Sequence, residues 1–103
     1  MPSIGFKKMV IKSFKDLDVE AFFLKGRKPI KKGWANAHKI VKRKLDMLHY
    51  ASELKDLRSP PGNNLESLSG DLKGYYSIRI NDQWRIVFAW DRQPYDVSIM
   101  DYH

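Results

Sequence analysis

The sequence contains no cysteine, which excludes disulfide bridges, a thiol nucleophile and a cysteine-based zinc site. A chain of this composition suits a reducing compartment, and we expect a cytoplasmic protein. Its three histidines, His38, His49 and His103, lie too far apart along the chain to indicate a metal site. No apolar run is long enough for a signal peptide or a membrane-spanning helix. We therefore expect no metal, no cofactor and no contact with a membrane.

Several common catalytic motifs are missing as well. The phosphate-binding pattern GxxxxGK[ST] is absent, because none of Gly62, Gly70 and Gly74 is followed by the required Lys-Ser or Lys-Thr pair. Neither the metalloprotease pattern HExxH nor the hydrolase pattern GxSxG occurs. The chemistry that remains is acid–base and electrostatic catalysis by Arg, Lys, Glu, Asp, Tyr and His side chains.

Negative charge is scarce in the first part of the chain. The 103 residues include 19 Lys and Arg against 12 Asp and Glu, a formal net charge of +7. Residues 1–58 hold 15 basic and 6 acidic residues, whereas residues 59–103 hold 4 and 6. Between Lys25 and Lys44 there is no carboxylate, although a solvated helix face usually interleaves both signs. This stretch predicts a surface for RNA, with an acidic protein or a merely solvated face as alternatives, and its candidate RNA contacts are Lys39, Lys42 and Arg43.

The spacing of apolar residues predicts a single α+β domain over residues 1–103. An alternating, β-branched run predicts a strand over 9–14, and a helix over 17–24 follows, capped by Asp16 and ended by Gly26. Apolar residues spaced by three and four predict a second helix over 34–52. After a break, alternation predicts strands over 65–68, 75–80, 84–90 and from 95 onward. The N-terminal strand and two helices are expected to pack on one face of a small antiparallel twisted sheet.

The predicted hairpin over 75–90 has a register that gathers its large apolar side chains on one face. A three-residue connection at 81–83 pairs Ile78 with Ile86, whereas a two-residue loop would mix the two faces. The same register sets Arg79 directly opposite Arg85 on the uncovered face, where like charges repel each other.

Two explanations for this facing pair of arginines stay open. An anion such as a phosphate lies between them, or each arginine pairs with a nearby carboxylate, for which Asp82 and Asp101 are candidates. Tyr75 shares the same face and is either a stacking platform for a base or a structural residue.

Cleavage of RNA needs no cofactor. The 2′-hydroxyl loses a proton and attacks the neighbouring phosphorus, the 5′-oxygen leaving group gains a proton, and cations stabilise the charge on the phosphorus oxygens. The chain ends with Asp101, Tyr102 and His103, which place a carboxylate, a phenol and an imidazole after a predicted strand. They are candidate catalytic groups, and the alternative is a frayed polar tail or, for His103, the remnant of an affinity tag.

Three segments resemble the HigB branch of the RelE/ParE toxin superfamily: MVIKSF, LRSPPGNNLESLSGDLKGYYSIRINDQWRIVFAW and the terminal YDVSIMDYH. The block GDLKGYYSIRINDQWRI and the closing DYH are specific in combination. The resemblance implies a RelE-like fold and a toxin of a type II toxin–antitoxin pair, a ribosome-dependent endoribonuclease that cuts messenger RNA. It also implies neutralisation by a helix-turn-helix antitoxin of the HigA kind, with operator DNA bound through the complex of the two.

The resemblance also implies roles for individual residues. The family's catalytic Asp-Tyr-His falls on 101–103, and its phosphate-contacting arginine falls on Arg85. A catalytic histidine of some relatives is replaced here by Glu66, and a lysine of the same relatives by Ser69. We therefore expect Glu66 to assist orientation or proton transfer, and His103 to be the principal acid or base.

Further roles implied by the resemblance concern phosphate binding and the start of the chain. Lys73, Arg79 and Arg85 are expected to hold phosphates. Residues 1–8 look like an N-terminal extension, with Met9 as an alternative start.

Two other functions stay open on the sequence. One is a non-enzymatic toxin like the ParE branch, which binds and inhibits DNA gyrase, and the other is a basic nucleic-acid-binding module without catalysis. The terminal Asp-Tyr-His and Arg85 favour the nuclease.

Overall fold

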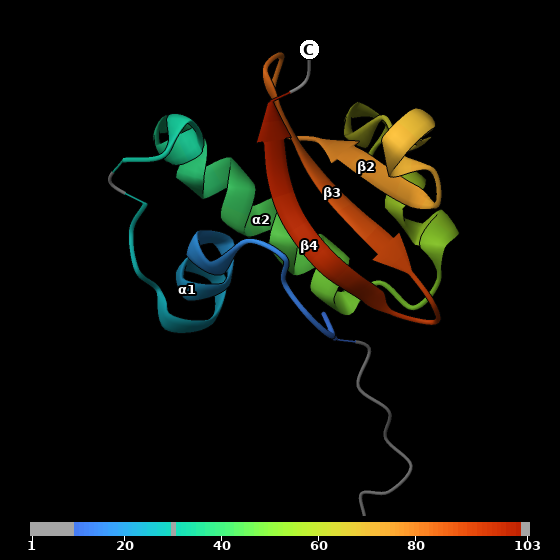
Figure 1. Ribbon diagram of the computed structural model, residues 1–103, viewed down its shortest axis with the longest axis horizontal. Helices are drawn as coiled ribbons and strands as arrows, with labels where there is room; N and C mark the ends of the chain where they lie inside the picture. Colours follow the sequence, from blue (N-terminus) through green and yellow to red (C-terminus); the bar gives the residue numbers. More distant parts are fainter. Residues whose placement is uncertain (1–9, 30, 102–103) are drawn as a thin grey trace, which may run out of the picture.

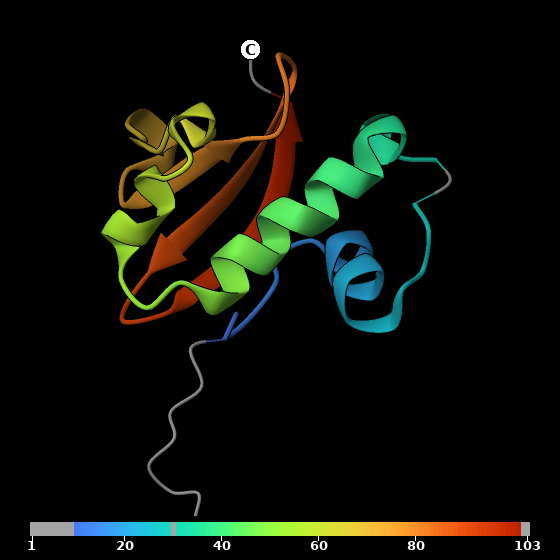
Figure 2. The same cartoon turned by 180° about the vertical axis from the view of Figure 1, so that it is seen from behind.

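The computed structural model describes residues 10–29 and 31–101 of the chain (Figure 1). It contains one antiparallel sheet in chain order, with two α-helices on one side of it (Figures 1 and 2). The expected α+β fold is confirmed, whereas the extension predicted over residues 1–8 lies outside the described residues. The elements are α1 (Leu17–Lys25), α2 (His38–Tyr50), β1 (Glu66–Ser67), β2 (Tyr75–Arg79), β3 (Trp84–Trp90) and β4 (Pro94–Asp101).

Helix α1 begins at the predicted Leu17 and runs to Lys25, one residue beyond the predicted range and directly before Gly26. The side chain of Asp16 accepts hydrogen bonds from the backbone amides of Asp18, at 2.9 Å, and Val19, at 3.3 Å. These bonds satisfy amides that the first turn of a helix leaves without partners. Gly26 ends the helix in the left-handed conformation, with φ at 70°. Among the helices of the described residues, none has the length and hydropathy needed to cross a membrane.

The second helix begins later than predicted. Residues Gly33–Ala37 form a 3₁₀ turn, and the α-helical part starts at His38. Gly33 lies so close to the ring of Trp84 that a Cβ atom at this position would overlap the ring. This turn is therefore shaped by a contact with the sheet, which helical periodicity does not report. The predicted apolar stripe of α2 is buried, as Val41, Leu45 and Leu48.

Two short 3₁₀ turns connect α2 to β1, and a third connects β1 to β2. They are η2 (Leu54–Arg58), η3 (Pro61–Asn63) and, after β1, η4 (Gly70–Leu72). Strand β1 lies within the predicted segment 65–68 and pairs with β2, with Glu66 opposite Ser77. The chain therefore returns to the open edge of β2 before the main hairpin begins.

The register of the main hairpin is the predicted one. Ile78 pairs with Ile86, and Arg79 pairs with Arg85. The side chain of Asn81 shapes the predicted connection by accepting hydrogen bonds from the amides of Gln83 and Trp84, each at 2.9 Å.

Of the strand predicted over 9–14, the described residues 10–14 form a single bridge instead of a regular strand, and Met9 lies outside the described residues. Phe14 pairs with Val97 in a parallel bridge, and the amide of Lys15 donates to the Val97 carbonyl at 2.9 Å. At Asp96 the ladder is interrupted, because its φ is 52° and its amide donates to Ser13 Oγ rather than to a carbonyl. The N-terminal segment therefore follows the edge of β4 without continuous pairing.

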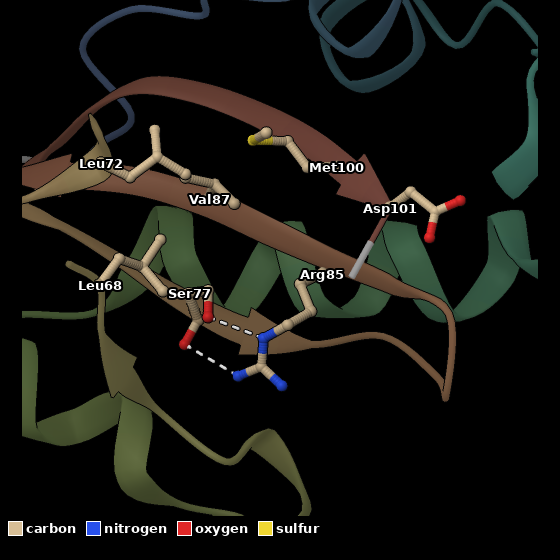
Figure 3. A pocket seen from close by; sticks show the side chains of 7 residues that line it. All are labelled: Leu68, Leu72, Ser77, Arg85, Val87, Met100 and Asp101. Carbon is tan, nitrogen blue, oxygen red and sulfur yellow. Dashed lines mark hydrogen bonds between the residues drawn. The ribbon is translucent and has the colours of Figure 1, made fainter. Parts of the chain in front are cut away.

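Strand β3 is buried on both faces. Phe88 is fully buried on the helix side, whereas Arg85 and Val87, on the opposite face, are 5% and 4% exposed. The face expected to be uncovered is thus covered at its centre, because Leu68 and Leu72 from the β1–η4 segment lie beside these side chains (Figure 3).

Candidate functional site

Arg85 is a buried cation that donates hydrogen bonds to two neutral oxygen atoms. Its Nε donates to Ser77 Oγ at 2.7 Å, and its Nη2 donates to the backbone carbonyl of Asn64 at 2.5 Å. Glu66 Oε1 lies 3.9 Å from the same Nη2. Strand register explains the contact with Ser77, which faces Val87 and so lies diagonally across from Arg85 on one face of the sheet. Since a guanidinium stays charged even when buried, these bonds hold a permanent positive charge in place.

A cavity of about 590 Å³ opens beside Arg85, on the face of the sheet away from the helices (Figure 3). Its volume lies within the range of about 300–1,000 Å³ that is typical of small-ligand sites. Apolar side chains make much of the wall and a few polar groups interrupt it, an arrangement that suits a ligand with a flat apolar part and an anionic part. The lining residues are Leu68, Leu72, Ser77, Arg85, Val87, Met100 and Asp101.

Asp101 lines this cavity, but its carboxylate points away from the guanidinium of Arg85 (Figure 3). It accepts a hydrogen bond from Gln83 Nε2 at 3.0 Å and lies opposite Trp84 in the sheet. The structure therefore places Arg85 and Asp101 at one cavity without an ion pair between them, and Glu66 lies near Arg85. Tyr102 and His103, the other two predicted catalytic residues at this end, lie outside the described residues.

Arg79 and Arg85 face each other but turn to different partners. Arg79 Nη2 lies 2.5 Å from Asp82 Oδ1, so the carboxylate alternative is the one observed for Arg79. Asp82 is fully exposed, and an exposed pair of this kind contributes little to stability. The repulsion that the register predicts is relieved because Arg85 bonds to Ser77 and Asn64 on the other side.

The turn at Asn63 and Asn64 connects the site to α2. Asn64 adopts the left-handed conformation, with φ at 44°, and presents its carbonyl to Arg85. Asn63 is fully buried, and its side-chain oxygen accepts a hydrogen bond from Nζ of Lys44. Its side-chain nitrogen donates to the carbonyl of Leu57 at 3.0 Å. The turn that positions Arg85 is therefore itself fixed by buried hydrogen bonds.

Lys44 is the one member of the basic stretch that the structure places in the interior. Its exposed fraction is 6%, although the sequence pattern treats it as part of a solvated basic surface. Burial lowers the pKa of Lys44 below its ordinary 10.5, and the positive charges of Arg43 and Arg79 act in the same direction.

Tyr75 does not line the cavity. Its hydroxyl donates to Asp96 Oδ2 at 3.0 Å, and Nζ of Lys15 lies 5.4 Å from the centre of its ring. The hydrogen bond to Asp96 and partial burial raise the pKa of Tyr75 above its ordinary 10.0. These contacts tie the N-terminal segment to the sheet, and base stacking by Tyr75 stays a prediction. Lys73 is exposed directly after η4, next to the cavity-lining Leu72.

Three predicted RNA contacts lie apart from the cavity. Lys39, Lys42 and Arg43 are exposed on α2, which covers the opposite face of the sheet (Figure 2). Lys42 pairs with Asp46 at 2.8 Å and lies 5.5 Å from the ring centre of Phe23. Any contact of these residues with RNA would therefore involve a second surface of the molecule.

Sequence reasoning did not identify Ser77 or Asn64 as parts of the site. Ser77 had a detectable signal, because the predicted register places this small polar residue diagonally from Arg85. The Asn64 carbonyl had none, since a backbone oxygen becomes a ligand through tertiary folding alone. Within the described residues no group of three or more His, Cys, Asp or Glu side chains is arranged to hold a metal ion.

Comparisons with known proteins connect this geometry to a family. A family model described as the RelE-like toxin of type II toxin-antitoxin system HigB matches residues 12–103. Toxin HigB-1 of Vibrio cholerae serotype O1 is 54% identical over 48 residues, which are 47% of this chain. That alignment spans about half of the Vibrio protein, 50% of its length.

Two further proteins are similar over longer stretches. An uncharacterized protein of Haemophilus influenzae is 38% identical over 69 residues, 67% of this chain and 68% of its own length. The solved structure of the YoeB dimer from Staphylococcus aureus covers 94% of this chain and 99% of its own, at 24% identity and a TM-score of 0.48.

Proposed function

The chain belongs to the family of RelE-like toxins of HigB type II toxin–antitoxin systems, and from this premise we propose that it is a ribosome-dependent endoribonuclease that cleaves messenger RNA. The observation that carries the proposal is the buried guanidinium of Arg85 at the wall of a cavity of about 590 Å³. A fixed positive charge in a site of low polarity is what the charge on a reacting phosphate requires.

In the proposed reaction the 2′-hydroxyl of one nucleotide gives up its proton and its oxygen bonds to the adjacent phosphorus. The bond from phosphorus to the 5′-oxygen breaks, and that oxygen takes a proton, which leaves a cyclic phosphate and a free 5′-hydroxyl. Arg85 stabilises the negative charge on the non-bridging oxygens. His103 is proposed as the principal acid or base, with Asp101 and Tyr102 beside it in the chain and Glu66 in an orienting or proton-transfer role.

The ribosome supplies the orientation that this site lacks by itself. The described residues offer one arginine and one carboxylate at the cavity and a second carboxylate, Glu66, 3.9 Å from that arginine, a modest set for proton transfer at neutral pH. Holding the 2′-oxygen in line with the leaving group is worth several orders of magnitude in rate. We therefore expect free RNA to be cut slowly or not at all, and a comparable rate on free RNA would contradict this part of the proposal.

The proposed partners follow from the family. The antitoxin is a helix-turn-helix protein of the HigA kind, and operator DNA is bound by the complex of the two proteins. Exposed Lys39, Lys42 and Arg43 on α2 are proposed to contact ribosomal RNA, away from the cavity. The proposed compartment is the cytoplasm, where ribosomes and messenger RNA are found.

The proposal is tested by mapping message ends in a translating extract with the wild type, His103→Ala and His38→Gln. We expect internal cuts with the wild type and with His38→Gln, a matched histidine change on α2, and a loss of at least about 100-fold with His103→Ala. Intact messages with the wild type would eliminate the nuclease. Full cleavage by His103→Ala would retain the nuclease but remove His103 from the chemistry.

A further inference from the structure

A second cavity, of about 400 Å³, lies between η2 and the edge of the sheet. It is smaller than the Arg85 cavity and still within the range of ligand sites. Two cations, one aromatic ring and apolar side chains line it, and the proposed chemistry of the Arg85 site uses none of them. The lining residues are Leu54, Lys55, Arg58, Leu65, Ser67 and Tyr76.

Strand β1 separates the two cavities. Side chains alternate between the faces of a strand, and here Ser67 and Tyr76 line the second cavity. Their chain neighbours Leu68 and Ser77 line the first, and Glu66 lies 3.9 Å from Arg85. The two cavities therefore lie on opposite faces of the two-residue ladder at the sheet edge, and a strand of RNA bound in the Arg85 cavity would have to pass this short edge to reach the second one.

The polar groups of the second cavity are suited to an anion. The side chain of Arg58 is exposed and makes no hydrogen bond or ion pair with any of the residues that the structure describes. Lys55 lies 4.0 Å from Glu53 Oε1, with both side chains more than half exposed, so this pairing is weak. Two cations with little competition from carboxylates can hold a phosphate group.

The remaining wall is suited to a base. Tyr76 is half-buried, and its ring packs on Phe88 with the ring centres 6.1 Å apart, which fixes its orientation. Turn η2, on the other side, is held by a reciprocal pair of hydrogen bonds between Glu53 and Asp56. An aromatic ring and apolar side chains beside paired cations are the usual elements of a sequence-tolerant site for a single-stranded nucleotide.

We propose that this second cavity binds one nucleotide of single-stranded RNA, its base against Tyr76 and its phosphate at Arg58 and Lys55. The proposal rests on the proposed function, because it takes the bound strand to be continuous with the RNA in the Arg85 cavity. Its role is to add affinity beyond the cleaved bond, independently of the charge that Arg85 supplies to the reaction.

The test measures binding of a fluorescein-labelled single-stranded RNA octamer to the intact protein by fluorescence anisotropy at several salt concentrations. Arg58→Ala is expected to weaken binding at least about threefold and to lower the magnitude of the salt slope by about 0.7, the contribution of one phosphate contact on a single strand. Tyr76→Leu is expected to weaken binding at least about fivefold, whereas Tyr76→Phe keeps the ring and binds like the wild type.

Arg92→Asn is the matched control. Arg92 is an exposed arginine that lines neither cavity, and its φ of 67° is one that asparagine tolerates. If Arg58→Ala and Arg92→Asn bind equally well, or if the wild type does not bind the octamer, the inference is overturned. If the wild type cuts messages while Arg58→Ala binds the octamer normally, this inference fails and the proposed function stands. If binding depends on Arg58 but no message is cut, the nuclease function fails and the nucleotide site stands.

Discussion

The two sides of the Asn63–Asn64 turn each bury one cation, and the two cations differ in what holds them. On the helix side, Lys44 is 6% exposed and donates to the side chain of Asn63. On the other side, Arg85 is 5% exposed and is held by Ser77 and the Asn64 carbonyl, with Glu66 at 3.9 Å. Burial lowers the pKa of Lys44, whereas a guanidinium keeps its charge in such surroundings.

The comparison shows that equal burial does not give equal function. Lys44 donates a hydrogen bond to the buried Asn63 and so serves as a structural donor on the α2 side, where burial lowers its pKa. Arg85 presents a planar charge with several donors at a cavity wall. The chain thus places its permanent buried charge at the wall of the cavity of about 590 Å³.

The largest effect on message cleavage is expected when the permanent positive charge of Arg85 is removed. Arg85→Ala should lower message cleavage in a translating extract by about 10²–10³-fold, the typical loss when one charge-stabilising donor is removed. Arg85→Lys keeps a charge but cannot reach Ser77 and Asn64 together, so we expect partial activity. A cleavage rate for Arg85→Ala within threefold of the wild type would remove Arg85 from the site.

Removing the shared turn residue should affect both sides. Asn63→Ala leaves Lys44 and the carbonyl of Leu57 without their buried partner, and we expect the free energy of unfolding to fall by about 2–3 kcal/mol. Urea unfolding measures this loss. Cleavage per folded molecule should also fall, because Asn64 would no longer be held against Arg85. An unchanged rate per folded molecule would show that the turn does not position Arg85.

The ionisation of Lys44 predicts a pH dependence of stability. Because the pKa of Lys44 is lowered on folding, its unfolded form binds more protons just below pH 10.5, and the contribution of Lys44 to stability should rise with pH there, against the opposite contributions of Lys32 and Tyr75, whose pKa values are raised. Lys44→Met should lower the slope of the free energy of unfolding against pH by at most about 1.4 kcal/mol per pH unit, the limit for one proton. Urea unfolding at several pH values compares the two slopes. A slope that Lys44→Met leaves unchanged would show that Lys44 titrates normally.

The smallest effect is expected at the exposed arginine. Asp82→Ala removes the partner of Arg79, yet we expect the free energy of unfolding to change by no more than about 0.5 kcal/mol, because both groups are solvated. Thermal unfolding at low and high salt measures this change. A loss above about 2 kcal/mol would mean that Arg79, like Arg85, depends on a fixed partner.

Most of the fold could be predicted from local patterns. Asp16 and Gly26 bound the first helix as predicted, because capping and left-handed φ depend on a few neighbouring residues. The pairing of Arg79 with Arg85 followed from alternation and the length of one turn. The strand over 9–14 and the start of α2 were predicted wrongly, because contacts at Asp96 and Trp84 decide them.

The sequence predicted which residues belong to the candidate site better than it predicted how they are arranged. The sequence indicated Arg85, Glu66 and Asp101, and the structure places Arg85 and Asp101 at one cavity with Glu66 3.9 Å from Arg85. It could not indicate that Lys44, in the middle of a basic stretch, is buried, since a helix pattern shows which face is apolar but not where a long side chain extends. The roles of Tyr102 and His103 stay predictions from the sequence.

By itself, the sequence determined the α+β order of elements, the hairpin register and the separation of a basic first half from a nearly neutral second half, because each depends on local periodicity or composition. Tertiary structure alone decided which charges are buried, which carbonyl orients Arg85 and where the two cavities open. Residues far apart in the chain, such as Asn64 and Arg85 or Lys44 and Asn63, meet through packing. No local pattern encodes the distance between them.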